Sequence, residues 1–290
     1  MYSNRLYSPL RYPGGKSAFA PFVAELMSHN GLVGGEYLEP YAGGAAVALE
    51  LLFHGVASRI HINDLDPAVF DFWSVVVHQP EEMLKLIRDT PINMDQWFHW
   101  RGVLRGTIET DQVNRAFATL FMNRTNRSGI LKAGVIGGLA QSGAYKLDAR
   151  FNKDVIAKRI EQIALRASQI TVHAKDALAL LKECHKFLPL NSLIYLDPPY
   201  YEKGQGLYRN FYEHDDHEKI ARTLFSSKFR RPWLVSYDNV AQIRDMYKYA
   251  EERTYGLNYT AQTRYVGSEV MFFSDRLSVP KMADAVGACA

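Results

Sequence analysis

Hydrophobic and polar residues follow two different periods along this chain, and these periods predict alternating strands and helices. Short apolar runs predict strands, whereas apolar residues spaced three or four apart predict helices. The predicted strands are 36–38, 59–62, 169–173, 192–196, 233–236 and 269–273. The predicted helices are 45–53, 81–87, 114–122, 153–167, 177–186 and 215–226, with another beginning at Pro67. Strands joined by helices are typical of parallel crossovers, so we expect a three-layer α/β fold with a mostly parallel sheet.

A helical and basic segment interrupts this pattern. Strand signals stop near residue 80, helical stretches follow as far as 122, and residues 123–152 are rich in glycine. Between 124 and 153 there are six basic residues and a single acidic one, Asp148. We therefore expect a discontinuous α/β domain over 1–66 and 168–277, an insert over 67–167, and a flexible tail over 278–290.

Composition narrows the class of protein only slightly. The chain has 290 residues, 47% of them hydrophobic, which suits one large domain or one domain with an insert. Its net charge of +3 permits an anionic partner without establishing one. The two cysteines, Cys184 and Cys289, make neither a disulfide framework nor a metal site. Two lone cysteines are typical of a reducing compartment, so we expect a cytoplasmic protein. No apolar run approaches the ~20 residues of a membrane span and no metal-ligand cluster is visible in the sequence, so we expect it to bind neither membrane nor metal.

The strongest chemical signal is the apolar strand 193–196 and the tetrapeptide that follows it, Asp197, Pro198, Pro199 and Tyr200. Open α/β sheets bind ligands at the carboxyl ends of their strands. There, Asp197 and the carbonyl of Pro198 can both accept from one amino group, while Tyr200 can lie flat against a planar base. The alternative is an ordinary strand-to-loop turn. The motif predicts a catalytic role for Asp197, Pro198 and Tyr200.

Three other segments carry weaker signals. Lys16 follows two glycines, but this segment lacks the glycine spacing of a true phosphate-binding loop. The turn over 39–44 joins a strand to a helix without the fingerprint of a dinucleotide fold, and by itself it suits a structural turn as well as a cofactor loop. Asp64 ends the second predicted strand, where an acidic residue typically binds ribose hydroxyls. A helix cap is the alternative, and Asp66 before Pro67 could equally serve as one.

Four segments in one order resemble the Dam-type family of DNA adenine-N6 methyltransferases. They are residues 11–16, 38–44, 63–64 and 197–200. The resemblance covers nearly the whole chain. It implies a Rossmann-like S-adenosylmethionine-dependent fold, with Tyr12 and Lys16 at the methionine end of the cofactor and Asp64 at the ribose. The expected cofactor-binding residues are Tyr12, Lys16, Glu39, Pro40, Ala42, Gly43, Asp64 and Asp197.

The family places its target-recognition segment where this chain has its insert. Amide and basic side chains over 123–127 suit phosphates and base edges. The expected DNA contacts are Asn123, Arg124, Asn126, Arg127, Lys132 and Lys146. Between Ser128 and Tyr145 the chain departs from better-known family members, so no base-reading residue is carried over there. A solvated flexible loop is the alternative.

The sequence thus predicts a monomeric enzyme that methylates the N6 amino group of adenine in double-stranded DNA. The base would be flipped out of the duplex and methylated by direct, in-line transfer. One alternative is another exocyclic amino group, cytosine N4 in DNA or a base in RNA. Asp197 stands where cytosine-N4 enzymes usually carry serine, which disfavours the first of these. The other alternative is a DNA-binding relative without catalysis, which four intact segments disfavour.

Overall fold

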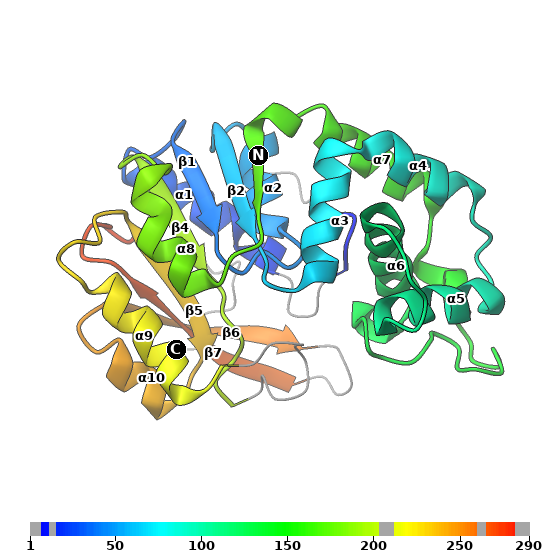
Figure 1. Cartoon of the computed structure of the whole chain (residues 1–290). Helices are drawn as coiled ribbons and strands as arrows, with labels where there is room; N and C mark the ends of the chain where they lie inside the picture. The colour runs from blue at the N-terminus through cyan, green and yellow to red at the C-terminus, as the bar shows by residue number, and fades with distance from the viewer. Residues whose placement is uncertain (1–6, 12–15, 203–211, 260–264, 282–290) are drawn as a thin grey trace. The chain divides into compact units, whose positions relative to one another are not determined.

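The computed structural model describes residues 7–11, 16–202, 212–259 and 265–281. Seven strands form one sheet in the order β3-β2-β1-β4-β5-β7-β6 (Figure 1). The strands are β1 (Glu36–Glu39), β2 (Arg59–Asn63), β3 (Ile170–His173), β4 (Ser192–Leu196), β5 (Trp233–Asp238), β6 (Glu251–Tyr259) and β7 (Tyr265–Phe273). β1 pairs in parallel with β2 and β4, and β4 with β5, whereas β7 runs antiparallel to β5 and β6. The predicted α/β fold with a mostly parallel sheet is therefore confirmed.

The order of the strands reverses direction between β1 and β4. From β1 the chain adds β2 and β3 on one side, and β4 and β5 follow on the other. Such a switch point leaves a crevice outside the carboxyl ends of the two central strands, where open α/β sheets bind ligands. Glu39 ends β1, and Asp197 follows the last residue of β4. The topology therefore predicts a ligand-binding site beside Glu39 and Asp197.

The contacts within the chain divide it into two compact units. The described residues of unit 1 are 16–65, 173–202, 212–259 and 265–281, and those of unit 2 are 7–11 and 66–172. The boundary falls between Leu65 and Asp66, and again inside β3. Unit 1 therefore contains most of the sheet, and unit 2 most of the segment between β2 and β3.

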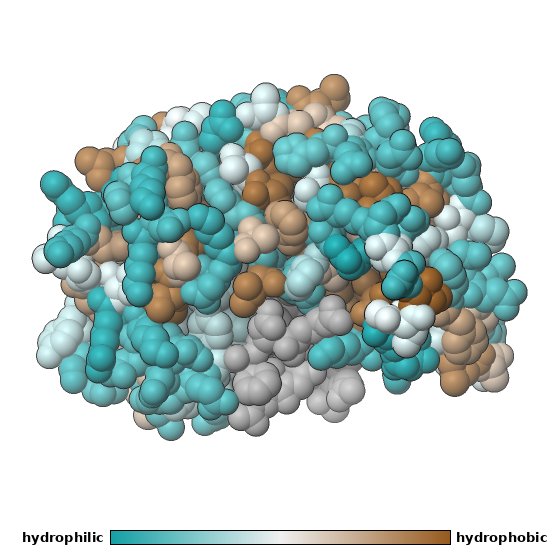
Figure 2. All heavy atoms as spheres, in the orientation of Figure 1, coloured by the Kyte–Doolittle hydropathy of each residue, from teal (hydrophilic) through white to brown (hydrophobic). Residues whose placement is uncertain are grey.

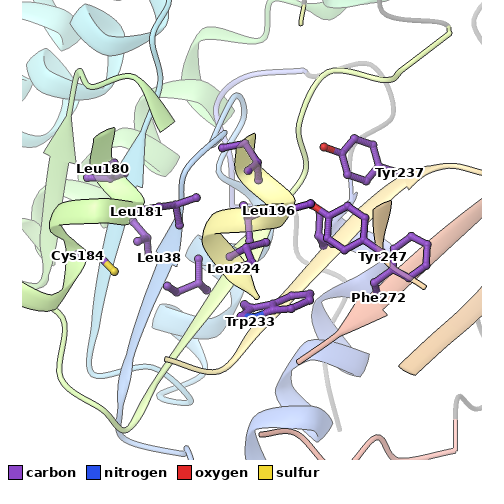
Figure 3. Close-up of a cluster of buried hydrophobic side chains, with 14 of the residues drawn as sticks. Leu38, Leu180, Leu181, Cys184, Leu196, Leu224, Trp233, Tyr237, Tyr247 and Phe272 are labelled. Atoms are coloured by element: carbon purple, nitrogen blue, oxygen red, sulfur yellow. The ribbon is translucent and has the colours of Figure 1, made fainter. Parts of the chain in front are cut away.

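In unit 1, helices cover both faces of the sheet. On one face, α8 (Ala177–Glu183), α9 (His214–Leu224) and α10 (Ala241–Met246) pack on β1, β4, β5 and β7 through a buried hydrophobic cluster (Figure 3). Its largest side chains include Trp233, Tyr237, Tyr247 and Phe272. Away from this cluster, the surface over α9 and α10 is largely hydrophilic (Figure 2). This is the amphipathic arrangement that the period of the sequence predicts for surface helices.

The opposite face carries the 3₁₀ helix Lys16–Phe19, α1 (Ala20–His29) and α2 (Ala46–Phe53). Successive side chains of a strand point to opposite faces, so Tyr195 and Ser236 lie on this face, whereas Leu196 and Tyr237 lie on the other. Phe22 of α1 meets Phe273 of β7 edge to face, with ring centroids 6.1 Å apart. Lys16 thus begins a helical segment on the same side of the sheet as Ser236.

The described residues of unit 2 are mostly helical, apart from the glycine-rich stretch and the first three residues of β3. Unit 2 contains α3 (Pro67–His78), α4 (Pro80–Asp89), α5 (Met94–Arg105), α6 (Gln112–Thr125) and α7 (Lys153–Ala164). Asp66 caps α3, since its side chain accepts from the backbone amide of Ala68 at 2.9 Å. Trp97 and Trp100 of α5 are buried, with 1% and 6% of their surfaces exposed. Short 3₁₀ turns at Arg127–Gly129 and Leu147–Arg150 lie within the glycine-rich stretch.

Among the α-helices and β-strands of the described residues, four were not predicted, namely α1, α5, α10 and β6. Most of the predicted tail, 282–290, lies outside the described residues. No helix in the described part of the chain is long and apolar enough to cross a membrane. The same residues contain no group of three or more histidines, cysteines or acidic residues arranged to hold a metal ion.

Candidate functional site

Asp197 stands directly after β4 and is fixed on one side by two polar neighbours. Its Oδ1 accepts from the hydroxyl of Ser236 on β5 at 2.6 Å and lies 3.3 Å from the ammonium of Lys16. Its other oxygen, Oδ2, has no hydrogen-bond partner among the described residues. The side chain keeps 28% of its surface exposed. The site therefore presents one carboxylate oxygen that is free to accept a hydrogen bond.

Burial raises the pKa of Asp197, and the nearby Glu269 raises it further, while Lys16 and the Ser236 hydroxyl oppose the shift. Lys16 is only 6% exposed, and burial by itself would lower the pKa of its ammonium. The carboxylates of Asp197 and Glu269 outweigh burial and raise that pKa. Lys16 is thus held as a buried cation between two acidic groups.

Glu269 completes this arrangement from β7. It is 1% exposed, and its Oε2 accepts from Lys16 at 2.6 Å and from the hydroxyl of Tyr255 at 2.5 Å. Its Oε1 accepts from the hydroxyl of Tyr200. Burial favours the neutral acid, but Lys16 and the two tyrosine hydroxyls more than offset it and lower the pKa of Glu269. We call Lys16, Asp197, Tyr200, Tyr255 and Glu269 the charged cluster.

The carboxyl end of the motif after β4 is anchored to β7 and to β5. Tyr200 is 6% exposed and donates to Glu269, while Asp238, at the end of β5, accepts from the backbone amides of Tyr201 and Glu202 at 2.9 and 3.0 Å. The chain leaving the motif is therefore fixed to β5 through the carboxylate of Asp238.

The sequence did not lead us to predict Glu269, Tyr255 or Ser236 as residues of the site. A usable signal was the acidic residue at the head of the apolar stretch 269–273. Glu269 is the first residue of the part of β7 that pairs with β5, and because the two strands are antiparallel it lies in register with Asp238 at the carboxyl end of β5. An acidic residue at that position therefore lies at the same edge as Asp197.

The predicted cofactor loop lies at the corresponding end of β1. Asp64 Oδ2 accepts from the backbone amide of Gly43 at 3.0 Å, and the amide of Ala42 donates to the carbonyl of Asn63 at 2.8 Å. Gly43 has a φ of 47°, in the left-handed region that glycine adopts without strain. The loop after β1 and the end of β2 thus form one connected edge.

Two other predicted cofactor residues have their polar atoms engaged inside unit 1. Glu39 is 6% exposed, and its Oε1 accepts from the Tyr37 hydroxyl and the Ala48 amide, both at 3.0 Å. Burial raises the pKa of Glu39 to about 8. The carbonyl of Pro40 accepts from the Asn63 side chain at 2.8 Å. Tyr12 and the two glycines after Pro13 lie outside the described residues.

The six predicted DNA contacts fall into two groups in unit 2. Asn123, Arg124 and Asn126 are 2%, 8% and 0% exposed, whereas Arg127, Lys132 and Lys146 are exposed. The buried group therefore disagrees with the expectation of direct DNA contact. Buried polar side chains need hydrogen-bond partners, and these three have found theirs within unit 2.

Their partners are nearby parts of the chain. Asn123 exchanges hydrogen bonds with the backbone of Arg11, both at 2.7 Å, and Arg124 donates from Nε to the carbonyl of Pro9 at 2.7 Å. Asn126 accepts from the indole of Trp97 at 2.8 Å. These side chains act as internal connections, and the exposed basic residues remain as candidates for DNA.

The comparisons with known sequences match methyltransferases. A family profile described as D12 class N6 adenine-specific DNA methyltransferase matches residues 12–261. Over 244 residues the chain is 23% identical to the Retron Ec67 DNA adenine methylase of Escherichia coli, covering 82% of this chain and 80% of that protein. Over 204 residues it is 23% identical to the type II methyltransferase M.MjaIII of Methanocaldococcus jannaschii, covering 66% and 68%.

Among solved structures, the chain is similar to the rRNA methyltransferase aviRa from Streptomyces viridochromogenes, with a TM-score of 0.37 and 12% identity. That similarity covers 87% of this chain and 82% of the other. The resemblance of the four sequence segments to adenine-N6 methyltransferases agrees with the family profile. Because that profile matches most of the chain, the protein belongs to the family of D12 class N6 adenine-specific DNA methyltransferases.

Proposed function

We propose that this methyltransferase uses Asp197, Pro198 and Tyr200 to methylate adenine N6 at specific sites in double-stranded DNA. The observation that carries the proposal is the state of Asp197. One oxygen is fixed by Ser236 and Lys16, and the other is free among the described residues at the end of β4. A fixed carboxylate with one free oxygen suits a group that accepts from an exocyclic amine.

The residues at this edge fit S-adenosylmethionine, which is the methyl donor of the family. Asp64 is half-buried, and its carboxylate suits ribose hydroxyls. The backbone of Ala42 and Gly43 lies beside it. When bound, the cofactor supplies a methyl group on a positively charged sulfur. Glu39 accepts from Tyr37 and from the amide of Ala48 in α2, and the carbonyl of Pro40 accepts from Asn63. Lys16 is a weaker candidate for the methionine carboxylate because two internal carboxylates already hold it.

The proposed chemistry at the amino group needs no covalent bond to the protein. Asp197 Oδ2 and the Pro198 carbonyl would each accept one amino hydrogen of adenine. Two acceptors draw the nitrogen lone pair out of conjugation with the ring and direct it toward the methyl group. The ring of Tyr200 would stack on the base. Much of the rate gain would come from holding the reacting atoms in line.

The amino group of adenine is paired inside the duplex, so the base must first leave the stack. We assign DNA contact to the exposed residues Arg127, Lys132 and Lys146 of unit 2, because cations at the surface suit phosphates. We further propose that the protein acts as a monomer and in the cytoplasm, where its DNA substrate is found.

The proposal is tested by expressing the protein in cells whose DNA lacks adenine methylation and mapping modified bases by single-molecule sequencing. We expect N6-methyladenine at one short recurring sequence. Methylation scattered without a common sequence would contradict site specificity, and modification of cytosine would contradict the assigned base.

A further inference from the structure

Glu269 and Asp197 share one buried ammonium, and they share it unequally. Lys16 lies 2.6 Å from Glu269 Oε2 and 3.3 Å from Asp197 Oδ1. Glu269 is 1% exposed, whereas Asp197 keeps 28% of its side chain exposed. The shorter and drier of the two salt bridges is therefore the one that does not involve the motif after β4. Charge-assisted contacts strengthen as they shorten and lose water.

We propose that Glu269 is a positioning residue that limits the contact between Lys16 and Asp197 to Oδ1 and so keeps the free oxygen of Asp197, Oδ2, available to the adenine amino group. The inference rests on the proposed function of Asp197. It adds a role for β7, because Glu269 begins the apolar part of that strand, accepts from Tyr200 of the motif and acts on Asp197 through Lys16.

From this geometry we infer the effect of neutralising Glu269. Lys16 is 6% exposed, so its ammonium cannot turn to water when it loses its closer partner. The carboxylate that remains nearby is Asp197, already 3.3 Å away. A buried cation that loses one acidic partner is costly to leave uncompensated, so we expect Lys16 to move closer to Asp197. The ammonium would then compete with the adenine amino group for Asp197.

The hydroxyls of Tyr255 and Tyr200 determine how strongly Glu269 attracts Lys16. The hydroxyl of Tyr255 donates to Oε2, the same oxygen that Lys16 contacts, and the hydroxyl of Tyr200 donates to Oε1. Each donor spreads part of the negative charge of Glu269. Removing the Tyr255 hydroxyl leaves more of that charge to Lys16 and draws the ammonium further from Asp197.

The two changes therefore move the protonation of Asp197 in opposite directions. The groups that act on Asp197 come from six elements and from the motif itself. They are Lys16, Tyr37, Glu39, Tyr195, Tyr200, Ser236, Tyr255 and Glu269. Neutralising Glu269 removes a repulsive charge and strengthens the pull of Lys16, so protonation of Asp197 shifts to lower pH. Removing the Tyr255 hydroxyl has the reverse effect.

The experiment measures single-turnover methyl transfer from tritiated S-adenosylmethionine to genomic DNA free of adenine methylation, between pH 5 and pH 9. In E269Q we expect the rate on the plateau to fall about tenfold or more. We expect the acidic limb of its pH profile to move down by roughly one pH unit. In Y255F we expect the acidic limb to move upward. The affinity for S-adenosylmethionine, measured by calorimetry, should stay within about twofold of wild type in both, since neither group is assigned to the cofactor.

Asp71→Asn is the matched control. Asp71 is also a buried carboxylate bound to a cation, Arg115, but it lies in unit 2. We expect D71N to lower the melting temperature without moving the acidic limb. If E269Q does not fold, as judged by circular dichroism, Y255F alone decides. An acidic limb that stays in place in Y255F, or that moves in the same direction in both variants, would overturn the proposal.

Failure of the proposed function gives a different result. Wild-type protein would then transfer no methyl group to adenine, whatever Glu269 does. In that case infrared titration of the protonated carboxyl stretch, assigned by its loss in D197N, still measures the protonation of Asp197. Opposite shifts of that band in E269Q and Y255F would support the sharing of Lys16, and unchanged bands would overturn it.

Discussion

The carboxylate of Asp64 accepts a hydrogen bond from the backbone amide of Gly43 at 3.0 Å, which ties the end of β2 to the glycine loop after β1. One residue thereby supports the loop and, on our proposal, binds the ribose of the cofactor. Two residues further along, Asp66 has the purely local role of capping α3. The two acidic residues can be separated by mutation.

We predict that Asp64→Ala weakens binding of S-adenosylmethionine roughly ten- to a hundredfold. The loss of a charge-assisted hydrogen bond should cost about 1.5–3 kcal/mol. Isothermal calorimetry measures the affinity directly. Asp66→Ala serves as the control and should lower the free energy of unfolding by about 1 kcal/mol with little change in affinity. Equal losses of affinity in the two variants would remove Asp64 from the ribose.

We predict that the exposed and buried basic residues of unit 2 respond differently to substitution. Alanine at Arg127, Lys132 or Lys146 should weaken DNA binding and lower the salt dependence of affinity by about one ion each, with an unchanged melting temperature. Alanine at Arg124 should lower the melting temperature instead, because the side chain is buried against the carbonyl of Pro9.

Binding is measured by fluorescence anisotropy on labelled duplexes at several salt concentrations. If the three exposed variants bind like wild type at every salt concentration, the DNA surface lies elsewhere in the protein. If Arg124→Ala keeps the wild-type melting temperature, its buried contact has no structural role.

We predict a stability effect of Glu39 that depends on pH. Burial raises the pKa of Glu39 from 4.5 to about 8, so the folded protein holds a proton that the unfolded chain releases. The stabilisation is complete below the unfolded pKa and is lost as pH rises toward about 8. Over this window the contribution of the group falls by up to about 1.4 kcal/mol per pH unit.

Glu39→Gln keeps an oxygen that can accept from Tyr37 and Ala48 but cannot ionise. Urea unfolding of both proteins between pH 5 and pH 8 should show the variant gaining stability relative to wild type as pH rises. Two curves that run parallel across this range would show that Glu39 is already ionised in the folded protein.

The elements that the sequence predicts best are those whose pattern is set by burial alone. Residues 192–196 form β4 as predicted, because all five are buried and apolar or small. β6 escaped prediction because it is an edge strand that begins with the exposed residues Glu251, Glu252 and Arg253. Charged residues are common at sheet edges, where they prevent pairing with other chains, and they hide the strand pattern.

The residues of the site could also be predicted only in part. Asp197 and Asp64 could be proposed from the sequence because each follows a strand. The contact between Lys16 and Glu269 joins residues 253 positions apart and depends on the antiparallel direction of β7, which no local pattern reveals. Asn123, Arg124 and Asn126 show the opposite difficulty. Side chains that suit DNA also suit the carbonyls of their own chain, and only tertiary contacts decide between them.

The most direct test of the account is the fate of a labelled methyl group. DNA is incubated with S-adenosylmethionine carrying a trideuterated methyl group and either wild-type protein or Asp197→Asn, then digested to nucleosides for mass spectrometry. We predict labelled N6-methyladenine with wild type and at least about a thousandfold less with the variant, equivalent to about 4 kcal/mol of lost transition-state stabilisation. Calorimetry should show that the variant still binds the cofactor. Label in N4-methylcytosine, or undiminished N6-methyladenine with Asp197→Asn, would contradict the central claim.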